Sequence, residues 1–151
     1  MKMEILQVAR EHLPGIAALE KICFSEPWSE NALGLFSGDG AVAFAAVDKE
    51  KILGYIGMLL APDEGQILNL AVLPEARRQG VAKALVARLI REAEARGLAA
   101  LSLEVRVSNS PAVRLYESFG FQTVGERKGF YRHPVENALV MIRPLAPKSD
   151  V

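Results

Sequence analysis

The sequence is poor in cysteine, in excess charge and in long apolar runs, and each shortage excludes a class of protein. Cys23 is the only cysteine among 151 residues, so no disulfide can form within the chain and a reducing compartment is expected. Lys and Arg together number 18, as do Asp and Glu, so the chain lacks the basic excess of a typical nucleic-acid-binding domain. The longest nearly apolar run, residues 52–61, is about half the length that a membrane-spanning helix requires. Because Glu4 and Arg10 interrupt the first apolar residues, no signal peptide is predicted, and we expect a cytoplasmic protein without membrane or direct nucleic-acid contacts.

What is present is an ordinary globular composition. Half of the residues are hydrophobic and 24% are charged, and the length suits one domain with a core of its own. No repeat, linker or low-complexity segment interrupts the chain. We therefore predict a single domain over residues 1–151, with a core at about 3–144 and a loose tail at 145–151.

Periodicity and turn signals predict alternating strands and helices in one α/β (α+β) domain. The predicted strands are 3–8, 41–47, 52–60, 66–73, 101–107, 121–127 and 136–144, and the predicted helices are 12–24, 29–38, 80–96 and 110–120. The order is β-α-α-β-β-β-α-β-α-β-β. Helix 80–96 is expected to bury an apolar stripe, and strand 101–107 is expected to alternate, with its apolar residues on one face. The stripe consists of Val81, Leu85, Val86, Leu89, Ile90 and Ala93, and the apolar face consists of Leu101, Leu103, Val105 and Val107. Ser29 and Asn109 (or Ser110) are expected N-caps, and Gly97 and Gly120 are expected to follow the last turns of their helices.

The turn between strand 66–73 and helix 80–96 has the features of an anion site. The first N–H groups of a helix lack intrahelical partners, and the helix dipole favours negative charge there. Gly80 would let a ligand approach the backbone, and Arg77 and Arg78 could bind phosphate oxygens. No Gly-Lys-Ser/Thr follows, so the turn is not a Walker A loop, and the glycines of a dinucleotide fingerprint are absent. Taken alone, the turn is equally typical of a solvated loop.

The segments that flank this turn make its sequence pattern more specific. Arg77-x-x-Gly80-x-Ala82 after an apolar strand resembles the acetyl-CoA motif of the GCN5-related N-acetyltransferases. NLAVLPEARRQGVAKALVARLIREAEARG resembles that motif throughout, and LEVRVSNSPAVRLYESFGF (103–121) resembles the second half of the family's cofactor and catalytic region. FSEPWSE, LEVRVSN and LYESFGF resemble, in particular, bacterial enzymes that acetylate the N-terminal alanine of a small-subunit ribosomal protein. The resemblance implies an acyltransferase with a twisted, mixed and mostly antiparallel sheet and with acetyl-CoA between two splayed central strands.

The resemblance also implies roles for individual residues toward acetyl-CoA. Backbone groups of one segment would bind the pantetheine and thioester, a second segment would surround the pyrophosphate, and one amide side chain would bond the pantetheine arm. The first segment is Leu70, Ala71 and Val72, the second is Arg78, Gln79, Gly80, Val81, Ala82 and Lys83 beside Arg77, and the amide is that of Asn109.

Acetyl transfer to an amine requires a base for the amine and a donor for the departing thiolate. Glu104, on the polar face of strand 101–107, matches the family's catalytic glutamate. Without the resemblance, a strand glutamate paired with Arg106 on the same face is favoured. Tyr116 matches the family's acid. A phenol of pKa about 10 can donate to a thiolate whose conjugate acid is near 8.5. Its alternative role is core packing. The backbone around Val72 is the expected source of N–H donors to the oxyanion.

The acceptor site is the least determined part. Phe24, Pro27 and Trp28 lie where the family receives its peptide, although a single Trp often packs a core, and Tyr131 could hold an extended peptide. The sequence leaves open another protein N-terminus, a lysine side chain or a small amine, and also a non-catalytic acetyl-CoA-binding module. Cys23 is expected to be a buried small hydrophobe because direct transfer needs no acyl-enzyme. No metal is expected, because the two histidines lack partners at ligand spacing.

Overall fold

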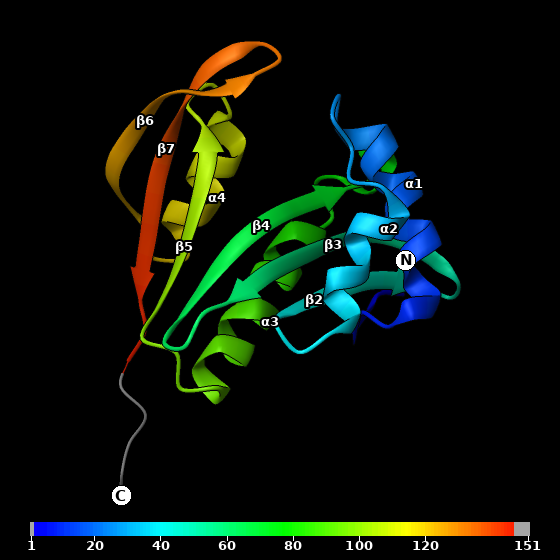
Figure 1. Ribbon diagram of the computed structural model, residues 1–151. Coiled ribbons are helices and arrows are strands. Elements are labelled where there is room, and N and C mark those ends of the chain that lie inside the picture. Colours follow the sequence, from blue (N-terminus) through cyan, green and yellow to red (C-terminus); the bar gives the residue numbers. More distant parts are fainter. Residues whose placement is uncertain (1, 147–151) are drawn as a thin grey trace, which may run out of the picture.

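A computed structural model describes residues 2–146, which form one seven-stranded sheet with helices on both faces (Figure 1). The strand order is β1-β2-β3-β4-β5-β7-β6, as expected for a mixed and mostly antiparallel sheet. The strands are β1 (Glu4–Gln7), β2 (Ala41–Asp48), β3 (Lys51–Leu60), β4 (Glu64–Val72), β5 (Ala100–Arg106), β6 (Gln122–Arg132) and β7 (Val135–Pro144). The α-helices are α1 (Leu13–Cys23), α2 (Glu30–Leu33), α3 (Val81–Ala95) and α4 (Ser110–Ser118). Short 3-10 turns occupy Arg10–His12, Gly34–Ser37 and Pro74–Ala76.

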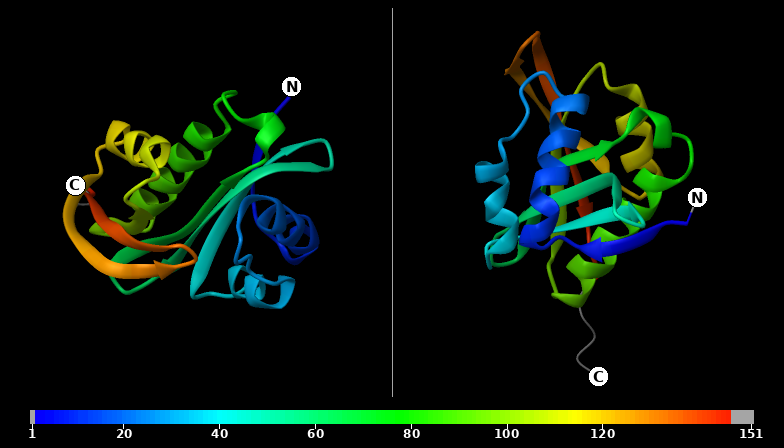
Figure 2. Two further views of the ribbon diagram at one scale, coloured as in Figure 1. Left: turned by 90° about the horizontal axis from the view of Figure 1, so that it is seen from above. Right: turned by 90° about the vertical axis from the view of Figure 1, so that its right-hand side faces the viewer.

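The helices are divided between the two faces of the sheet. Figure 2 shows α1 and α2 on one face and α3 and α4 on the other. The stripe predicted for α3 is confirmed, since Val81, Leu85, Val86, Leu89, Ile90 and Ala93 are all buried. Burying each large side chain of this kind contributes about 1.5–3 kcal/mol. Strands β2 and β3 are covered on both faces, which explains why seven of the eight residues of β2 are buried.

The two central strands, β4 and β5, separate along their length. They are parallel and pair only from Glu64↔Ala100 to Ile67↔Leu103, although β4 continues to Val72 and β5 to Arg106. On the other side of β4, the pairing with β3 skips Leu68, because Gly57 faces Asn69 and Met58 faces Ile67. Such a bulge bends a strand and increases its twist. The expected splay is therefore confirmed, and Figure 1 shows β4 and β5 diverging from a common end.

The predicted caps agree with the structure. The Ser29 hydroxyl accepts the Ala32 N–H at 3.1 Å, and Asn109, not Ser110, caps α4 by accepting the Ala112 N–H at 3.2 Å. Gly97 and Gly120 adopt φ of 71° and 90°, the left-handed conformation that ends a helix.

Several boundaries differ from the predicted ones. Strand β6 continues to Arg132, beyond the predicted end at 127, because it pairs with β7 up to Arg132↔Val135. Val107 lies beyond β5 and is 38% exposed, not on the buried face as expected. Leu145, placed in the expected tail, is buried and donates its N–H to the Ala99 carbonyl at 2.8 Å. Residues 147–151 of the expected tail lie outside the described residues.

None of the helices in residues 2–146 combines the length and apolar content needed to cross a bilayer.

Candidate active site

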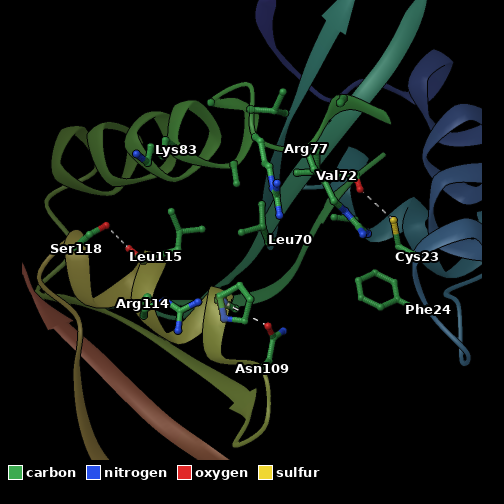
Figure 3. A pocket seen from close by; sticks show the side chains of 18 residues that line it. Cys23, Phe24, Leu70, Val72, Arg77, Lys83, Asn109, Arg114, Leu115 and Ser118 are labelled. Atoms are coloured by element: carbon green, nitrogen blue, oxygen red, sulfur yellow. Dashed lines mark hydrogen bonds between the residues drawn. The ribbon is translucent and has the colours of Figure 1, made fainter. Parts of the chain in front are cut away.

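A cavity of about 910 Å³ lies between the end of β4, the start of α3 and the exposed side of α4 (Figure 3). We call it the α3–α4 cavity. Four cationic side chains line it, and none of its described lining residues is acidic. The cations are Arg77, Arg78, Lys83 and Arg114. The charge of this cavity therefore suits an anionic ligand.

The turn before α3 presents backbone N–H groups to the same cavity. Arg78 and Gly80 adopt φ of 65° and 81°, and the first intrahelical bond runs from the Ala84 N–H to the Gly80 carbonyl at 3.0 Å. No side chain caps the helix start, so the N–H groups of Val81, Ala82 and Lys83 remain for a ligand. A Cβ on Gly80 would meet no atom within 4 Å, so the approach to this turn is open. The structure thus places the basic side chains and the N–H groups of this turn on one cavity.

The edge of β4 that faces away from β3 supplies further backbone groups. The Leu73 N–H donates to the Leu53 carbonyl of β3 at 2.8 Å. Because the peptide groups of successive strand residues point to opposite sides, those of Leu70 and Val72 point away from β3, into the gap between β4 and β5. The Cys23 thiol confirms this direction, because it donates to the Val72 carbonyl at 3.4 Å (Figure 3).

A second cavity, of about 540 Å³, is bordered by α1, the segment that follows it and the β6–β7 hairpin. We call it the α1–β6 cavity. It shares Cys23, Phe24, Leu70, Asn109 and Ala112 with the α3–α4 cavity, so the two cavities meet where β4 and β5 separate.

Glu104 lies in the wall of the α1–β6 cavity with its side chain only 15% exposed. Its carboxylate accepts hydrogen bonds from Arg127 Nη1 at 3.0 Å and from Gln66 Nε2 at 3.4 Å. The alternative pairing with Arg106 is wrong. Arg106 instead binds the Glu136 carboxylate at 3.1 Å, because its position at the end of β5 faces the start of β7.

Tyr116 also lines the α1–β6 cavity, from α4. It is buried, and its ring packs edge to face on Phe121 at 5.3 Å between centroids. Burial, with a smaller contribution from Tyr131, raises the pKa of the Tyr116 phenol well above its ordinary value. Tyr116 therefore stays protonated and can donate a hydrogen bond at any working pH.

Three of the four residues expected at the acceptor site line this cavity. They are Phe24, Trp28 and Tyr131, whereas Pro27 is exposed and is not among the lining residues. Trp28 also stacks on Phe36 at 6.2 Å, so it both packs and lines the cavity. Tyr131 donates to the Glu104 main-chain carbonyl at 3.3 Å. Among the expected cofactor residues, only Gln79 does not line the α3–α4 cavity, since its side-chain amide bonds the Glu75 carbonyl at 3.1 Å.

Cys23 differs from its expected role as a buried hydrophobe. It is half-buried and borders both cavities. Burial raises the pKa of its thiol, and the charge of Arg77 offsets only part of that effect. Within residues 2–146, no three His, Cys, Asp or Glu side chains are grouped so that they could hold a metal ion.

Sequence reasoning missed a buried carboxylate beside the second cavity. Glu20 is fully buried and accepts hydrogen bonds from Trp28, Tyr55 and Asn69. The signal was available, because Glu20 continues the buried stripe of α1 at Leu13, Ile16 and Ala17 with helical spacing.

Comparisons with known proteins agree with this geometry. Residues 13–121 match the Acetyltransferase (GNAT) family. The chain is 35% identical over 136 residues to the [ribosomal protein bS18]-alanine N-acetyltransferase of Escherichia coli K12, covering 89% of this chain and 92% of that one. The crystal structure of the ribosomal-protein-S18-alanine N-acetyltransferase from Escherichia coli superposes with a TM-score of 0.91 at 32% identity, covering 99% and 97% of the two chains.

The fold is shared more widely. Arabidopsis thaliana NAA60, solved in complex with acetyl-CoA, gives a TM-score of 0.86 at 20% identity, with 95% and 99% of the chains covered. The family match and the Escherichia coli relative together establish that the chain belongs to the acetyltransferase (GNAT) family of acyltransferases.

Proposed function

We propose that the chain transfers the acetyl group of acetyl-CoA directly to the N-terminal α-amine of the small-subunit ribosomal protein bS18. One observation carries this proposal: a cationic cavity without acidic lining residues meets a carboxylate-bearing cavity where two central strands separate. The arrangement suits a phosphate-bearing acyl donor in the first cavity and an amine in the second. The acceptor is inferred from the name of the Escherichia coli relative, which matches over 92% of its length.

Acetyl-CoA suits the α3–α4 cavity by its charge and by the hydrogen-bonding groups that the cavity offers. The N–H groups of Val81, Ala82 and Lys83 would bind the pyrophosphate at the start of α3, with Arg77 and Arg78 adding charge-assisted bonds. The peptide groups of Leu70 and Val72 would pair with the pantetheine, as a strand would. Asn109 uses its Oδ1 to cap α4, which leaves its NH₂ group to donate to the pantetheine arm. NAA60, which shares the fold, was solved with acetyl-CoA, which supports this ligand.

The acceptor amine must lose a proton before or during attack. An α-amine has a pKa of about 7.7–8.0, so a useful fraction is already neutral near pH 7. Glu104, on the wall of the α1–β6 cavity, would accept the proton that the amine loses, directly or through a water molecule. The Arg127 and Gln66 bonds fix its carboxylate in place.

Attack on the thioester carbonyl creates an oxyanion and releases a thiolate. The Val72 N–H points into the gap between β4 and β5 and would donate to the oxyanion. Tyr116, kept protonated by burial, would donate to the sulfur as the C–S bond breaks. The proton balance closes because the amine loses one proton to Glu104 and the thiolate gains one.

A peptide assay tests the acceptor. A synthetic peptide with the mature bS18 N-terminus should release coenzyme A from acetyl-CoA in the presence of the enzyme. The same peptide with a blocked N-terminus should not, and a blocked peptide with a single internal lysine should not. Equal activity on the lysine peptide would instead assign a side-chain acetyltransferase. Binding of acetyl-CoA without formation of free coenzyme A would assign a non-catalytic module. Mass spectrometry of bS18 from cells that lack the protein should show a free N-terminal amine.

A further inference from the structure

Glu20 is the one charged side chain that is buried among residues 2–146, and the catalytic steps above do not use it. Removing an ionised carboxylate from water is costly unless hydrogen bonds replace its hydration. An apolar residue of similar size at this position of α1 would pack at lower cost. The presence of a carboxylate here therefore requires an explanation from its partners.

The two oxygens of Glu20 bind different parts of the molecule. Oε1 accepts the backbone N–H of Trp28 at 2.9 Å, in the segment after α1. Oε2 accepts the Tyr55 hydroxyl of β3 at 2.5 Å and the Asn69 amide of β4 at 2.9 Å. Burial and the Glu20 carboxylate raise the pKa of the Tyr55 phenol, so Tyr55 remains a donor. One side chain thus joins a loop to two strands of the sheet.

These contacts lie on two walls of the α1–β6 cavity. Trp28 belongs to the wall formed by the segment after α1, and Asn69 belongs to β4, next to the bulged Leu68. The distance between the two walls is therefore set through the carboxylate of Glu20. Without it, the Trp28 N–H and the Asn69 amide would lose their shared acceptor.

We propose that Glu20 is a positioning residue that fixes the width of the acceptor cavity and so selects acceptors by the size of their first residue. This inference rests on the proposed function, because it assigns the α1–β6 cavity to the acceptor. Glu20 borders this cavity, but both of its oxygens accept hydrogen bonds from the protein, so we assign it no catalytic role. It acts through the segment that carries Phe24 and Trp28, which line the cavity.

The chain offers its own probe, because Trp28 is the only tryptophan. We would compare the wild type with Glu20→Leu, which removes both acceptor oxygens, and Glu20→Gln, which keeps one. Val86→Ala is the matched control, since Val86 is fully buried on α3, on the opposite face of the sheet. Each variant is measured for Tm, for acrylamide quenching of Trp28, for acetyl-CoA affinity and for KM and kcat toward the bS18 peptide.

We expect Glu20→Leu to increase quenching of Trp28 and to raise the peptide KM about tenfold to a hundredfold, the effect of losing hydrogen bonds to a charged group. Acetyl-CoA affinity should stay within about twofold. Glu20→Gln should give a Trp28 quenching and a peptide KM between those of the wild type and of Glu20→Leu. It keeps the test valid if Glu20→Leu does not fold. The Glu20 variants should lose less activity toward peptides that begin with a larger residue than toward the peptide that begins with alanine.

The inference is overturned if both Glu20 variants lower Tm while the peptide KM and the Trp28 quenching stay as in the wild type. It is also overturned if Val86→Ala raises the peptide KM as much as Glu20→Leu does. If the wild-type enzyme does not acetylate the peptide at all, the proposed acceptor is wrong. The quenching measurement, which needs no acceptor, then decides by itself whether Glu20 holds the Trp28 segment.

Discussion

Replacing Gly57 by alanine should displace the aromatic side chains beside the α1–β6 cavity. Gly57 is buried in β3, and a Cβ there would lie 2.5 Å from Cε1 of Phe36. Carbon atoms in contact are ordinarily about 3.5–4.0 Å apart, so the Phe36 ring must retreat by about 1 Å. The ring cannot retreat freely, because it stacks on Trp28 at 6.2 Å and meets the edge of Tyr55 at 6.3 Å. The displacement should therefore reach the wall of the α1–β6 cavity.

Overpacking of this kind costs about 1–3 kcal/mol. A domain of this size loses about 2–4 °C in Tm for each kcal/mol, so Gly57→Ala should lower Tm by roughly 2–12 °C. Trp28 emission should change and the peptide KM should rise, while acetyl-CoA affinity stays the same because β3 does not line the α3–α4 cavity. Differential scanning fluorimetry, Trp28 fluorescence and calorimetry with acetyl-CoA measure these three quantities.

Gly34→Ala is the control for Gly57→Ala. Gly34 has a helical φ of −56°, and a Cβ there meets no atom within 4 Å. Alanine at this position should be neutral or stabilising by about 0.4–1 kcal/mol. Adding Phe36→Leu to Gly57→Ala should restore part of the stability that Gly57→Ala loses, because the smaller side chain makes room for the new Cβ. A Gly57→Ala variant with the Tm and emission of the wild type would refute the packing argument.

Three further predictions concern the reaction itself. Glu104→Gln should slow acetyl transfer by about 10²–10⁴, most strongly below the amine pKa of about 7.7–8.0, and an unchanged pH–rate profile would remove Glu104 from the mechanism. Tyr116→Phe should slow turnover while acetyl-CoA affinity stays nearly intact; a large loss of affinity would show a structural role instead. Burial raises the pKa of Cys23, so iodoacetamide should alkylate it more slowly than a free thiol, at a rate that increases with pH. Acetyl-CoA should protect Cys23, because the thiol borders the α3–α4 cavity, and alkylation at an unchanged rate would place the cofactor elsewhere.

The sequence was sufficient where local rules govern the structure. The stripe of α3 follows from helical spacing, and the open, basic turn before α3 follows from a strand, two arginines and a glycine before a helix. These features depend on residues within about one helical turn of one another. The prediction that Leu101, Leu103 and Val105 share one face of β5 held for the same reason, since all three are buried.

The sequence was insufficient where partners come from distant segments. Glu104 and Arg127 are 23 positions apart and meet only because β5, β7 and β6 are neighbours in the sheet. Glu20 and Asn69 are 49 positions apart, and nothing local to either indicates the other. A glutamate on an apolar stripe and an asparagine within an apolar strand are, however, each unusual enough to be noted together in another sequence.

The separation of β4 and β5 has a kinetic consequence. Since the two cavities are bordered largely by different elements and share only the residues where β4 and β5 separate, donor and acceptor would enter through different openings. Neither reactant would then obstruct the arrival of the other, and each product could depart while its neighbour stays bound. Turnover would pass through a complex of enzyme, donor and acceptor without a compulsory order of addition.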